Sequence, residues 1–363
     1  MIRVGVDVGP LHGPITGVGQ AVDGMVRQLR QQTSVELTEY VVSFRAKLHE
    51  NTQRLPFPAG LSIKSWGQRD FPPVDPFFRG VQLLHGMNYV VPPTKLPRVV
   101  TVYDCWALLN PAQCSSITND AMKALRRAIQ TGAVVHTSSH ATATTVRELF
   151  PSARIEMIYL GAPERRSSNS QEIRPDALSN MGDAPFIVAI GTEEKRKNYP
   201  RLVEAFARAA REHPDLQLVI AGSPGDDSDR LQQIVHSLSP NLAGRVHRLG
   251  RVTDDNIAWL YQQATAMAYP SLDEGFGFPL LEAMSANLPI VGSTSGSIPE
   301  VSGTAAILVD PLDVPALAEA LIDVATNSEL RIKLQFAGAT QLQSFTWEKT
   351  AQQLVNLYND LVK

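Results

Sequence analysis

Two carboxylates flank a glycine-rich turn in the stretch Ser271-Leu272-Asp273-Glu274-Gly275-Phe276-Gly277-Phe278-Pro279-Leu280-Leu281-Glu282. Pro279 suits the first position of a helix, because its φ is already helical and the N–H that it lacks would find no helical carbonyl. Gly275 and Gly277 can adopt backbone angles closed to other residues, so their N–H groups can turn toward a ligand. The stretch predicts a helix N-terminus that favours an anion. A strand-turn-helix corner with solvated acids is the alternative.

The bulk composition sets the broad class. A chain of 363 residues exceeds what one hydrophobic core usually serves, so we expect two domains. Hydrophobic residues at 44% and charged residues at 19% are typical of a globular protein, and a net charge of -3 gives no argument for nucleic acid. The two cysteines suit a reducing compartment and have no metal-ligand spacing. With a strand-like N-terminus and no apolar run of membrane length, we expect a cytoplasmic protein that contacts a membrane only at its inner face, if at all.

Short apolar strands alternate with helical patterns in both halves of the chain, which predicts an α/β fold with doubly wound parallel sheets. The expected strands are residues 2–8, 35–42, 81–85, 99–103, 133–137, 155–159, 186–190, 216–221, 246–249, 266–269, 290–292 and 306–309. The expected helices are residues 119–131, 139–150, 198–211, 254–263, 279–286, 314–326 and a last one from Thr346. Residues 161–183 are rich in Ser, Arg and Pro without apolar periodicity, so we expect the linker there.

Three adjacent cations, Lys195, Arg196 and Lys197, follow the expected strand at residues 186–190. In open α/β sheets, ligands bind beyond the carboxyl ends of the strands. Cations in such a loop can hold a diphosphate through charge-assisted hydrogen bonds. A solvated charged loop would explain the cluster alone, but its position and the second anion-favouring turn at residues 275–279 favour a diphosphate site.

Three motifs together resemble the retaining nucleotide-sugar glycosyltransferases of family 4, which have the GT-B fold. They are Gly191 to Asn198, Tyr269-Pro270-Ser271 through Glu282-Ala283-Met284, and Gly296-Ser297-Ile298-Pro299-Glu300-Val301. The spacing from Glu274 to Glu282 is that family's signature, and the loop at residues 195–198 resembles that of its mannosyltransferase-like branch. The opening Gly5-Val6-Asp7 with Thr16-Gly17-Val18-Gly19 is similar to the N-terminal loop of that branch.

The resemblance implies two Rossmann-like domains that face across a cleft. Residues 1–165 would form the acceptor-side domain and residues 166–345 the nucleotide-sugar-binding domain. Residues 346–363 would form a C-terminal helix that returns to the first domain.

The resemblance also implies roles for individual residues. Arg196 and Lys197 would grip the donor diphosphate, Glu282 would accept hydrogen bonds from the ribose, and Glu274 would hold the transferred sugar. The expected donor site also includes Gly17, Gly19, Thr192, Arg248, Gly275, Phe276, Gly277, Phe278 and Leu281. We expect neither a metal nor a cofactor, because the family needs no divalent metal and the nucleotide sugar is a substrate. The acidic run Asp226-Asp227-Ser228-Asp229 is better explained by helix capping.

One departure from the family concerns the residues after the strand at 99–103. The family often has His-Asp there, whereas this chain has Tyr103-Asp104. Tyr103 can offer a hydroxyl but cannot serve as an imidazole acid or base. We keep both as catalytic candidates, and place His85 and Asn88 on the acceptor side, although a single histidine at a strand end is more often structural. Asn287 replaces a Gly that is usual in the family, and we expect this difference to affect only the C-terminus of the helix at residues 279–286.

Residues 55–79 combine aromatic, proline and basic residues without periodicity. We expect a long irregular loop that, with Lys123, Arg126 and Arg127, could contact anionic lipid carrying a polyprenyl-linked acceptor. Aromatic residues packed against their own domain are the alternative.

The expected function is transfer of a hexose, with mannose or a deoxyhexose such as rhamnose favoured. The donor would be a nucleotide diphosphate sugar, the acceptor a hydroxyl of a glycan, a lipid-linked acceptor or a small molecule, and the anomeric configuration would be retained. An epimerase or phosphorylase on the same fold, and a non-catalytic sugar-nucleotide-binding protein, are the alternatives. The sequence leaves the base, the sugar, the acceptor and the oligomeric state open.

Overall fold

The computed structural model describes residues 1–13, 16–43, 52–163 and 172–363. The chain divides into two compact units: Met1–Gly161 with Phe345–Lys363, and Ala162–Ser344. The sequence placed the domain boundary at residues 165–166, a few residues from this division. Part of the expected linker, residues 164–171, lies outside the described residues.

The first unit contains a seven-stranded sheet with the order β3-β2-β1-β4-β5-β6-β7, in which every neighbouring pair is parallel. Its inner strands are buried on both faces, as β5 illustrates, in which all five residues are buried. The strands are β1 (Ile2–Asp7), β2 (Val35–Val42), β3 (Gln53–Leu55), β4 (Leu83–Gly86), β5 (Arg98–Val102), β6 (Val134–Thr137) and β7 (Ile155–Met157).

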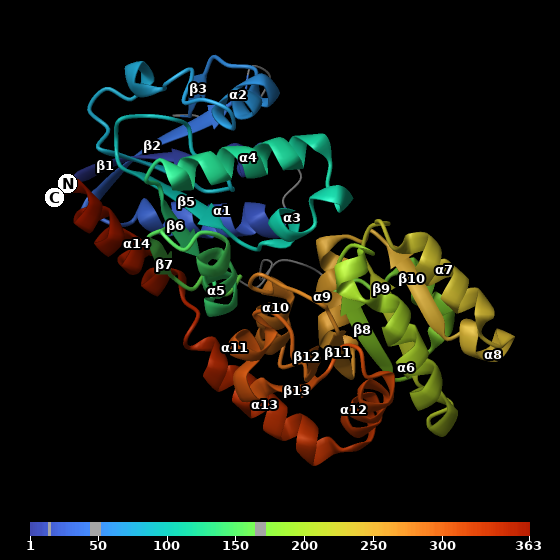
Figure 1. Cartoon of the computed structure of the whole chain (residues 1–363). Helices are drawn as coiled ribbons and strands as arrows, with labels where there is room; N and C mark the ends of the chain where they lie inside the picture. Colours follow the sequence, from blue (N-terminus) through green and yellow to red (C-terminus); the bar gives the residue numbers. More distant parts are fainter. Residues whose placement is uncertain (14–15, 44–51, 164–171) are drawn as a thin grey trace. The chain divides into compact units, whose positions relative to one another are not determined.

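Helices cover this sheet on both faces, and hydroxyl side chains cap four of them. Thr16, Ser115, Ser139 and Thr346 each accept a hydrogen bond from the backbone N–H three residues later. The helices are α1 (Gly17–Leu29), α2 (Ala59–Trp66), α3 (Trp106–Leu109), α4 (Ser116–Gln130), α5 (His140–Leu149) and α14 (Trp347–Val362), with 3-10 turns at η1 (Gly9–Leu11), η2 (Asp75–Phe77) and η3 (Pro111–Gln113). Figure 1 shows α14, in red, beside the strands of this unit.

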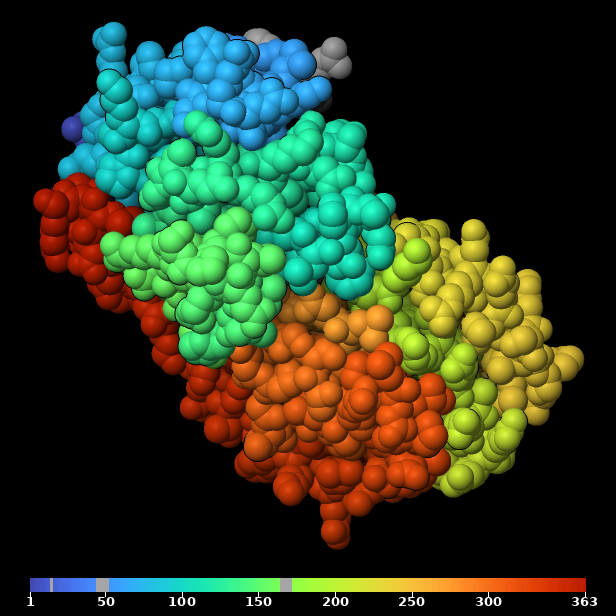
Figure 2. Space-filling model, viewed as in Figure 1, coloured from blue at the N-terminus to red at the C-terminus, as the bar shows by residue number. Residues whose placement is uncertain are grey.

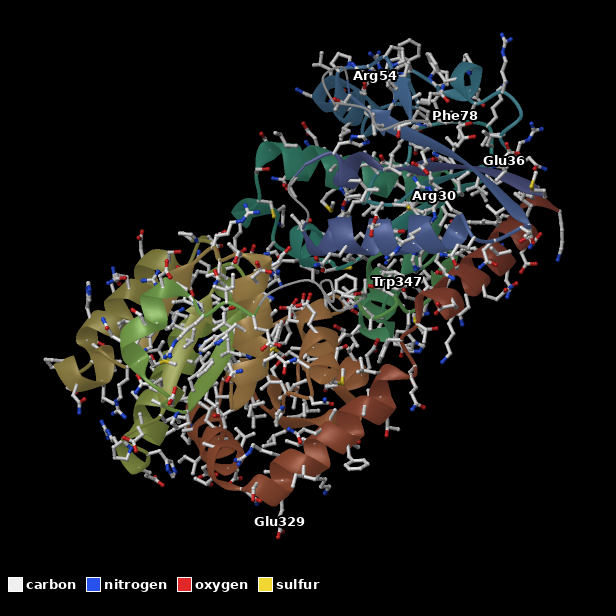
Figure 3. All side chains as sticks on the ribbon, turned by 180° about the vertical axis from the view of Figure 1, so that it is seen from behind. Arg30, Glu36, Arg54, Phe78, Glu329 and Trp347 are labelled. Atoms are coloured by element: carbon white, nitrogen blue, oxygen red, sulfur yellow. The ribbon has the colours of Figure 1, made fainter. Side chains whose placement is uncertain are left out.

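The C-terminal helix packs closely on the first unit through Trp347, which Figure 3 labels. A Cβ atom on Gly24 of α1 would lie 2.3 Å from the Trp347 ring, and one on Gly161 would lie 2.4 Å from it. Further along α14, Thr350 Oγ1 donates a hydrogen bond to the Tyr159 carbonyl at 2.7 Å. The predicted return of the last helix to the first domain is therefore confirmed.

The second unit contains a six-stranded parallel sheet with the order β10-β9-β8-β11-β12-β13. The strands are β8 (Phe186–Ile190), β9 (Gln217–Ala221), β10 (Val246–Gly250), β11 (Ala266–Tyr269), β12 (Ile290–Ser293) and β13 (Ala306–Val309). The helices are α6 (Tyr199–Glu212), α7 (Ser228–Ser237), α8 (Pro240–Ala243), α9 (Asp254–Gln263), α10 (Phe278–Ser285), α11 (Ile298–Ser302), α12 (Val314–Thr326) and α13 (Ser328–Leu342). The 3-10 turns are η4 (Asp176–Met181), η5 (Lys195–Lys197) and η6 (Gly303–Ala305).

Both sheets have a point at which the strand order reverses. It lies between β1 and β4 in the first unit and between β8 and β11 in the second. Loops that leave the carboxyl ends of the two strands at such a point diverge to opposite faces, which opens a crevice for ligands. The predicted α/β class with two doubly wound sheets is confirmed, and the reversals indicate where each unit is able to bind a ligand.

Some expected elements differ from those observed. The segment expected to be irregular, residues 55–79, contains α2 and the 3-10 turn η2, and its apolar side chains, Trp66 and Phe78 among them, enter the core of the first unit. Helix α13 was not predicted, since its apolar residues do not form one stripe: Phe336 is 76% exposed, whereas Leu334 is buried. Pro279 occupies the second position of α10 rather than the first.

Candidate functional site

The predicted cationic loop leaves the carboxyl end of β8 and is fixed in place by Asn198. This residue has a left-handed conformation with φ 59°, a region that Asn tolerates better than most residues. Its Nδ2 donates to the carbonyl of Pro270 at 3.2 Å and to that of Pro311 at 2.7 Å. The N–H of Leu272 in turn donates to the carbonyl of Arg196 at 2.7 Å. The loops after β8 and β11 are therefore joined at the point where the strand order reverses.

Arg196, Lys197 and Glu274, here called the Glu274 triad, meet at this junction. Lys197 Nζ lies 2.6 Å from Glu274 Oε1, and Arg196 Nη1 lies 2.8 Å from Glu274 Oε2. The side chains of Lys197 and Glu274 are 7% and 8% exposed, whereas that of Arg196 is 27% exposed. Arg196 also pairs with Glu194, and Lys197 donates to the hydroxyl of Tyr269. The structure brings together the three residues that the sequence placed at the diphosphate and the sugar.

The charges within the Glu274 triad determine its ionisation. Burial alone would raise the pKa of Glu274, but the charges of Lys197 and Arg196 lower it to about 2. Burial lowers the pKa of Lys197, and the nearby Glu274 carboxylate opposes this effect. Glu274 is therefore a carboxylate at neutral pH. Within the triad two basic side chains face one carboxylate, and Glu194, which pairs with Arg196, supplies a second negative charge beside them.

The glycine turn before α10 has one strained position. Gly277 has φ 94°, a conformation that favours glycine, whereas Gly275 is not among the residues with positive φ. The expectation of special backbone angles is thus confirmed for Gly277 and wrong for Gly275. Phe276 and Phe278 are 5% and 8% exposed, with their rings in edge contact at 5.5 Å. Their side chains therefore help to fix the turn.

A second glycine approaches the backbone of Glu274. A Cβ atom on Gly296 would lie 2.7 Å from both the N and the O atoms of Glu274. The next residue, Ser297, donates its N–H to the Glu274 carbonyl at 3.0 Å. The sequence pointed to Gly296 only through the family motif, because a contact between two loops leaves no periodic signal. Gly296 is therefore a supporting residue of the Glu274 triad.

Glu282 lies on α10 and accepts a hydrogen bond from the hydroxyl of Tyr261 at 2.8 Å. The residue is partly exposed. Leu281 has 0% exposure, which limits it to structural support rather than the donor contact that we expected. Thr192, in the loop after β8, is partly exposed.

The prediction that Arg248 contacts the donor is wrong in this conformation. Its Nε and Nη2 donate to the two carboxylate oxygens of Glu193 at 2.9 and 2.6 Å, and Nη1 bonds to Gln232. Glu193 is only 3% exposed, so this bidentate pair is a structural link between β10 and the loop after β8. The residues that follow Arg248 instead line a cavity of about 570 Å³, in which Leu249, Arg251 and Val252 face Pro175.

The acidic run after β9 supports the cationic loop rather than capping α7. Asp226 Oδ1 accepts a hydrogen bond from the N–H of Lys195 at 2.9 Å. Asp227 is the N-cap residue of α7, but its side chain makes no capping hydrogen bond. The expected capping hydrogen bond is therefore not made by Asp227, but the acidic Asp229 in the first turn of α7 complements the helix dipole. Among the described residues, no three His, Cys, Asp or Glu side chains gather in a way that could hold a metal ion.

In the first unit, His85 is a core residue, so its placement on the acceptor side is wrong. It has 0% exposure and belongs to a buried chain of hydrogen bonds. The carbonyl of Ile158 can only accept, so His136 Nε2 donates to it and His136 Nδ1 accepts from the Thr101 hydroxyl. Thr101 Oγ1 then accepts from His85 Nε2, and His85 Nδ1 accepts from the hydroxyl of Tyr358 on α14. Both histidines are neutral in this chain.

The other candidates in the first unit also have internal partners. The Tyr103 hydroxyl donates to the Met87 carbonyl at 2.8 Å, so it is not available to a sugar as we expected. Asp104 Oδ1 accepts from the N–H of Trp106 at 3.0 Å. The N–H of Gly19 donates to Thr16 Oγ1, so its amide is not directed at a ligand.

Two further candidates remain accessible. Gly17, the first residue of α1, is exposed. Asn88, just after β4, is partly exposed.

The residues expected to touch a membrane mostly have partners within the protein. Trp66 and Phe78 are 2% and 3% exposed, and only Phe71, at 58%, is well exposed among the aromatic residues of the segment. Of the α4 cations, Lys123 pairs with Asp120, Arg127 with Asp70, and Arg126 lies over the Phe150 ring. Figure 2 shows the segment, in light blue, on the surface of the first unit. No helix in the described ranges is long and apolar enough to cross a membrane.

Comparison with known proteins identifies what the second unit is similar to. Residues 170–341, which lie within that unit, match the family model of glycosyl transferases group 1. The chain as a whole is 29% identical over 304 residues to the O-antigen chain mannosyltransferase B of Escherichia coli, an alignment that covers 81% of this chain and 76% of that protein.

Two solved structures share the fold of this chain. Sucrose-phosphate synthase from Thermosynechococcus elongatus superimposes with a TM-score of 0.74 and 20% identity over 99% of each chain. Anabaena HepE in complex with UDP-glucose gives a TM-score of 0.71 and 19% identity over 99% of this chain and 100% of that one. At these identities the similarity establishes the GT-B fold alone.

Proposed function

We propose that this chain transfers a hexose, mannose or a deoxyhexose such as rhamnose, from a nucleotide diphosphate sugar to a hydroxyl acceptor with retention of configuration. The acceptor is a glycan, a lipid-linked saccharide or a small molecule. The relative named as an O-antigen chain mannosyltransferase supports the sugar, and the related fold with bound UDP-glucose supports the donor class.

The Glu274 triad carries this proposal. A diphosphate that binds at the carboxyl ends of β8 and β11 meets Arg196 and Lys197, which neutralise the charge that grows on it as the glycosidic bond breaks. The phosphate oxygens then compete with Glu274 for these cations. The Glu274 oxygens become able to accept hydrogen bonds from the hydroxyls of the sugar, which a carboxylate can do in pairs.

The remaining contacts complete the donor site. Glu282 accepts hydrogen bonds from the ribose, and the cavity beside Leu249, Arg251 and Val252 holds the base. Its volume of about 570 Å³ falls within the roughly 300–1,000 Å³ that is usual for small-molecule sites.

Retention follows if the leaving phosphate departs from the face that the acceptor enters and helps to deprotonate the acceptor hydroxyl. No metal is part of this proposal, since the two cations of the triad supply the positive charge that the leaving group requires. Membrane attachment is not part of it either, because most of the residues expected to support it are engaged within the protein.

Thermal-shift measurements of the whole chain with GDP-, UDP-, dTDP- and ADP-sugars test the proposal. A ligand that binds the folded state raises the apparent melting temperature. We expect one base class to shift it, and the matching nucleoside diphosphate to be released in the presence of acceptor. If no nucleotide sugar stabilises the chain, the proposed function is wrong. Turnover of donor without acceptor, or only with phosphate, would identify an epimerase or a phosphorylase.

A further inference from the structure

An ion pair between Glu193 and Arg248 joins the loop after β8 to the end of β10. The Nε and Nη2 atoms of Arg248 donate to the two carboxylate oxygens of Glu193 at 2.9 and 2.6 Å. The side chain of Glu193 is 3% exposed and that of Arg248 is 21% exposed. Nη1 of Arg248 also donates to Gln232 on α7. A planar, bidentate pair of this kind fixes orientation as well as distance.

The two partners stand directly before the two halves of the proposed donor site. Glu193 precedes the cationic loop, in which Arg196 and Lys197 are the proposed contacts of the diphosphate. Arg248 precedes the residues that line the cavity proposed for the base, beginning with Leu249. A nucleoside diphosphate has to reach both places at once. The ion pair therefore joins the same two places that the ligand would join.

The end of β10 is irregular at this point. The register between β10 and β9 shifts between Arg248 and Gly250, and Gly250 has φ 64°. Beyond the shift, the carbonyl of Gly250 accepts the N–H of Gly222 at 2.9 Å. A bulge of this kind bends the strand and redirects the residues that follow it. The direction of the chain toward Arg251 and Val252 therefore depends on more than regular strand pairing.

The Glu193 end of the ion pair is held by the backbone. The N–H of Glu193 donates to the carbonyl of Ser223, and the carbonyl of Glu193 accepts the N–H of Asp227, both at 3.0 Å. A Cβ atom on Gly225 would lie 2.6 Å from the same carbonyl, so the loop after β9 packs closely against it. The ion pair thus attaches the irregular end of β10 to a fixed loop.

We propose that the Glu193–Arg248 ion pair is a positioning device of the donor site, which holds the base cavity and the cationic loop at the separation of one nucleoside diphosphate. The pair acts through the residues that follow it rather than by contact with the ligand. A ligand that meets two preplaced sites binds more tightly than its separate parts, because the second contact costs little further freedom. The pair therefore raises the affinity for a whole nucleoside diphosphate but not for pyrophosphate alone. This inference rests on the proposed function.

The test compares a nucleoside diphosphate with inorganic pyrophosphate in calorimetric titrations of the full-length chain. The nucleoside diphosphate is the one among GDP, UDP, dTDP and ADP that binds the wild type. The double variant Glu193→Leu with Arg248→Met removes the pair without leaving a buried charge unpaired. We expect it to bind the nucleoside diphosphate about tenfold to a hundredfold more weakly, and pyrophosphate as the wild type does. In transfer assays the KM for the donor should rise by the same factor while kcat changes little.

Two further variants separate this role from general support of the fold. Arg245→Met is the matched control, because Arg245 lies just before β10 and donates to the carbonyls of Ala210 and Pro214, near the opposite end of the strand. It should lower the urea midpoint and leave both affinities unchanged. Arg248→Lys keeps the charge but loses the bidentate geometry. It should weaken binding of the nucleoside diphosphate by less than the double variant does, and it decides the question alone if the double variant does not fold.

Three results would overturn the proposal. Equal loss of affinity for the nucleoside diphosphate and for pyrophosphate would mean that the pair only supports the fold. Unchanged binding of the nucleoside diphosphate by the deciding variant would mean that the pair positions nothing. A wild type that binds the nucleoside diphosphate but not pyrophosphate would mean that the cationic loop is not preformed. A wild type that binds none of the four nucleoside diphosphates would instead disprove the proposed function.

Discussion

Lys197, in the loop after β8, and Glu274, in the loop after β11, form an ion pair of 2.6 Å at the reversal of strand order in the second sheet. The two residues lie 77 positions apart in the chain, yet both side chains are almost fully buried. Two loops that would otherwise diverge are held together at one charged point. The geometry of the proposed donor site therefore depends on this pair before any ligand binds.

Lys197→Ala is expected to lower the rate of sugar transfer by about 10²- to 10³-fold, roughly 3 to 4 kcal/mol, because it removes a preorganised positive charge from the leaving group. Steady-state kinetics with the preferred donor measure this. Lys195→Ala is the matched control, since Lys195 lies in the same loop but is exposed. Full turnover by Lys197→Ala would remove the diphosphate assignment.

Glu274→Gln and Glu282→Gln should have different effects. Glu274→Gln is expected to damage transfer much more than nucleotide binding, because its partner in the donor is the sugar. Glu282→Gln should weaken binding of the nucleoside diphosphate itself, because its proposed partner is the ribose. Calorimetric titration with the free nucleotide, set beside transfer rates, separates the two. Equal loss of both activities in Glu274→Gln would contradict this division.

The buried histidines predict that stability falls in mild acid. Burial lowers the pKa of His136 from the ordinary 6.5 to about 4, although its bond to the Ile158 carbonyl raises it. Between these values the unfolded chain binds a proton that the folded chain excludes, so stability is complete above pH 6.5 and is lost as the pH falls toward 4. The loss from His136 is on the order of 3 kcal/mol.

Urea midpoints between pH 7.5 and 4.5 test this expectation. His136→Gln should flatten the dependence, whereas His140→Gln, which removes an exposed histidine of the same unit, should not. Comparing variants with the wild type cancels the opposite contribution of Asp7, whose pKa burial raises to about 6. A pH dependence that is the same in the wild type and in His136→Gln would contradict the burial of a neutral His136.

Gly24→Ala should destabilise the chain although alanine is the better helix former. The new Cβ would lie 2.3 Å from the Trp347 ring, and overpacking of this kind costs about 1–3 kcal/mol. Gly60→Ala in α2 is the control, because a Cβ there meets nothing within 4 Å and should stabilise by up to about 1 kcal/mol. Thermal unfolding measures both. Equal stabilisation by the two substitutions would show that α14 does not depend on this contact.

Much of the fold could be predicted from the sequence because several strands, such as β8 and β13, are continuous apolar runs. The bounds of β2, β8, β11 and β13 agree with those expected. Helix α2 was missed because its apolar residues stand among prolines and charges and reach the core only through tertiary packing. Helix α13 was missed because some of its apolar residues face solvent. Periodicity indicates a helix only where its apolar residues form one stripe.

The sequence by itself determined the residues of the Glu274 triad and the glycine turn beside it. These residues directly follow predicted strands, and the spacing of Glu274 and Glu282 is visible in the sequence, so both signals can be recognised without knowing the tertiary contacts. Only the tertiary structure decided how the remaining polar residues are used. It showed Arg248 locked to Glu193 and His85 in a buried chain with Tyr358. A side chain's partners come from segments far apart in the chain, so its type and position alone do not reveal whether it is engaged or available to a ligand.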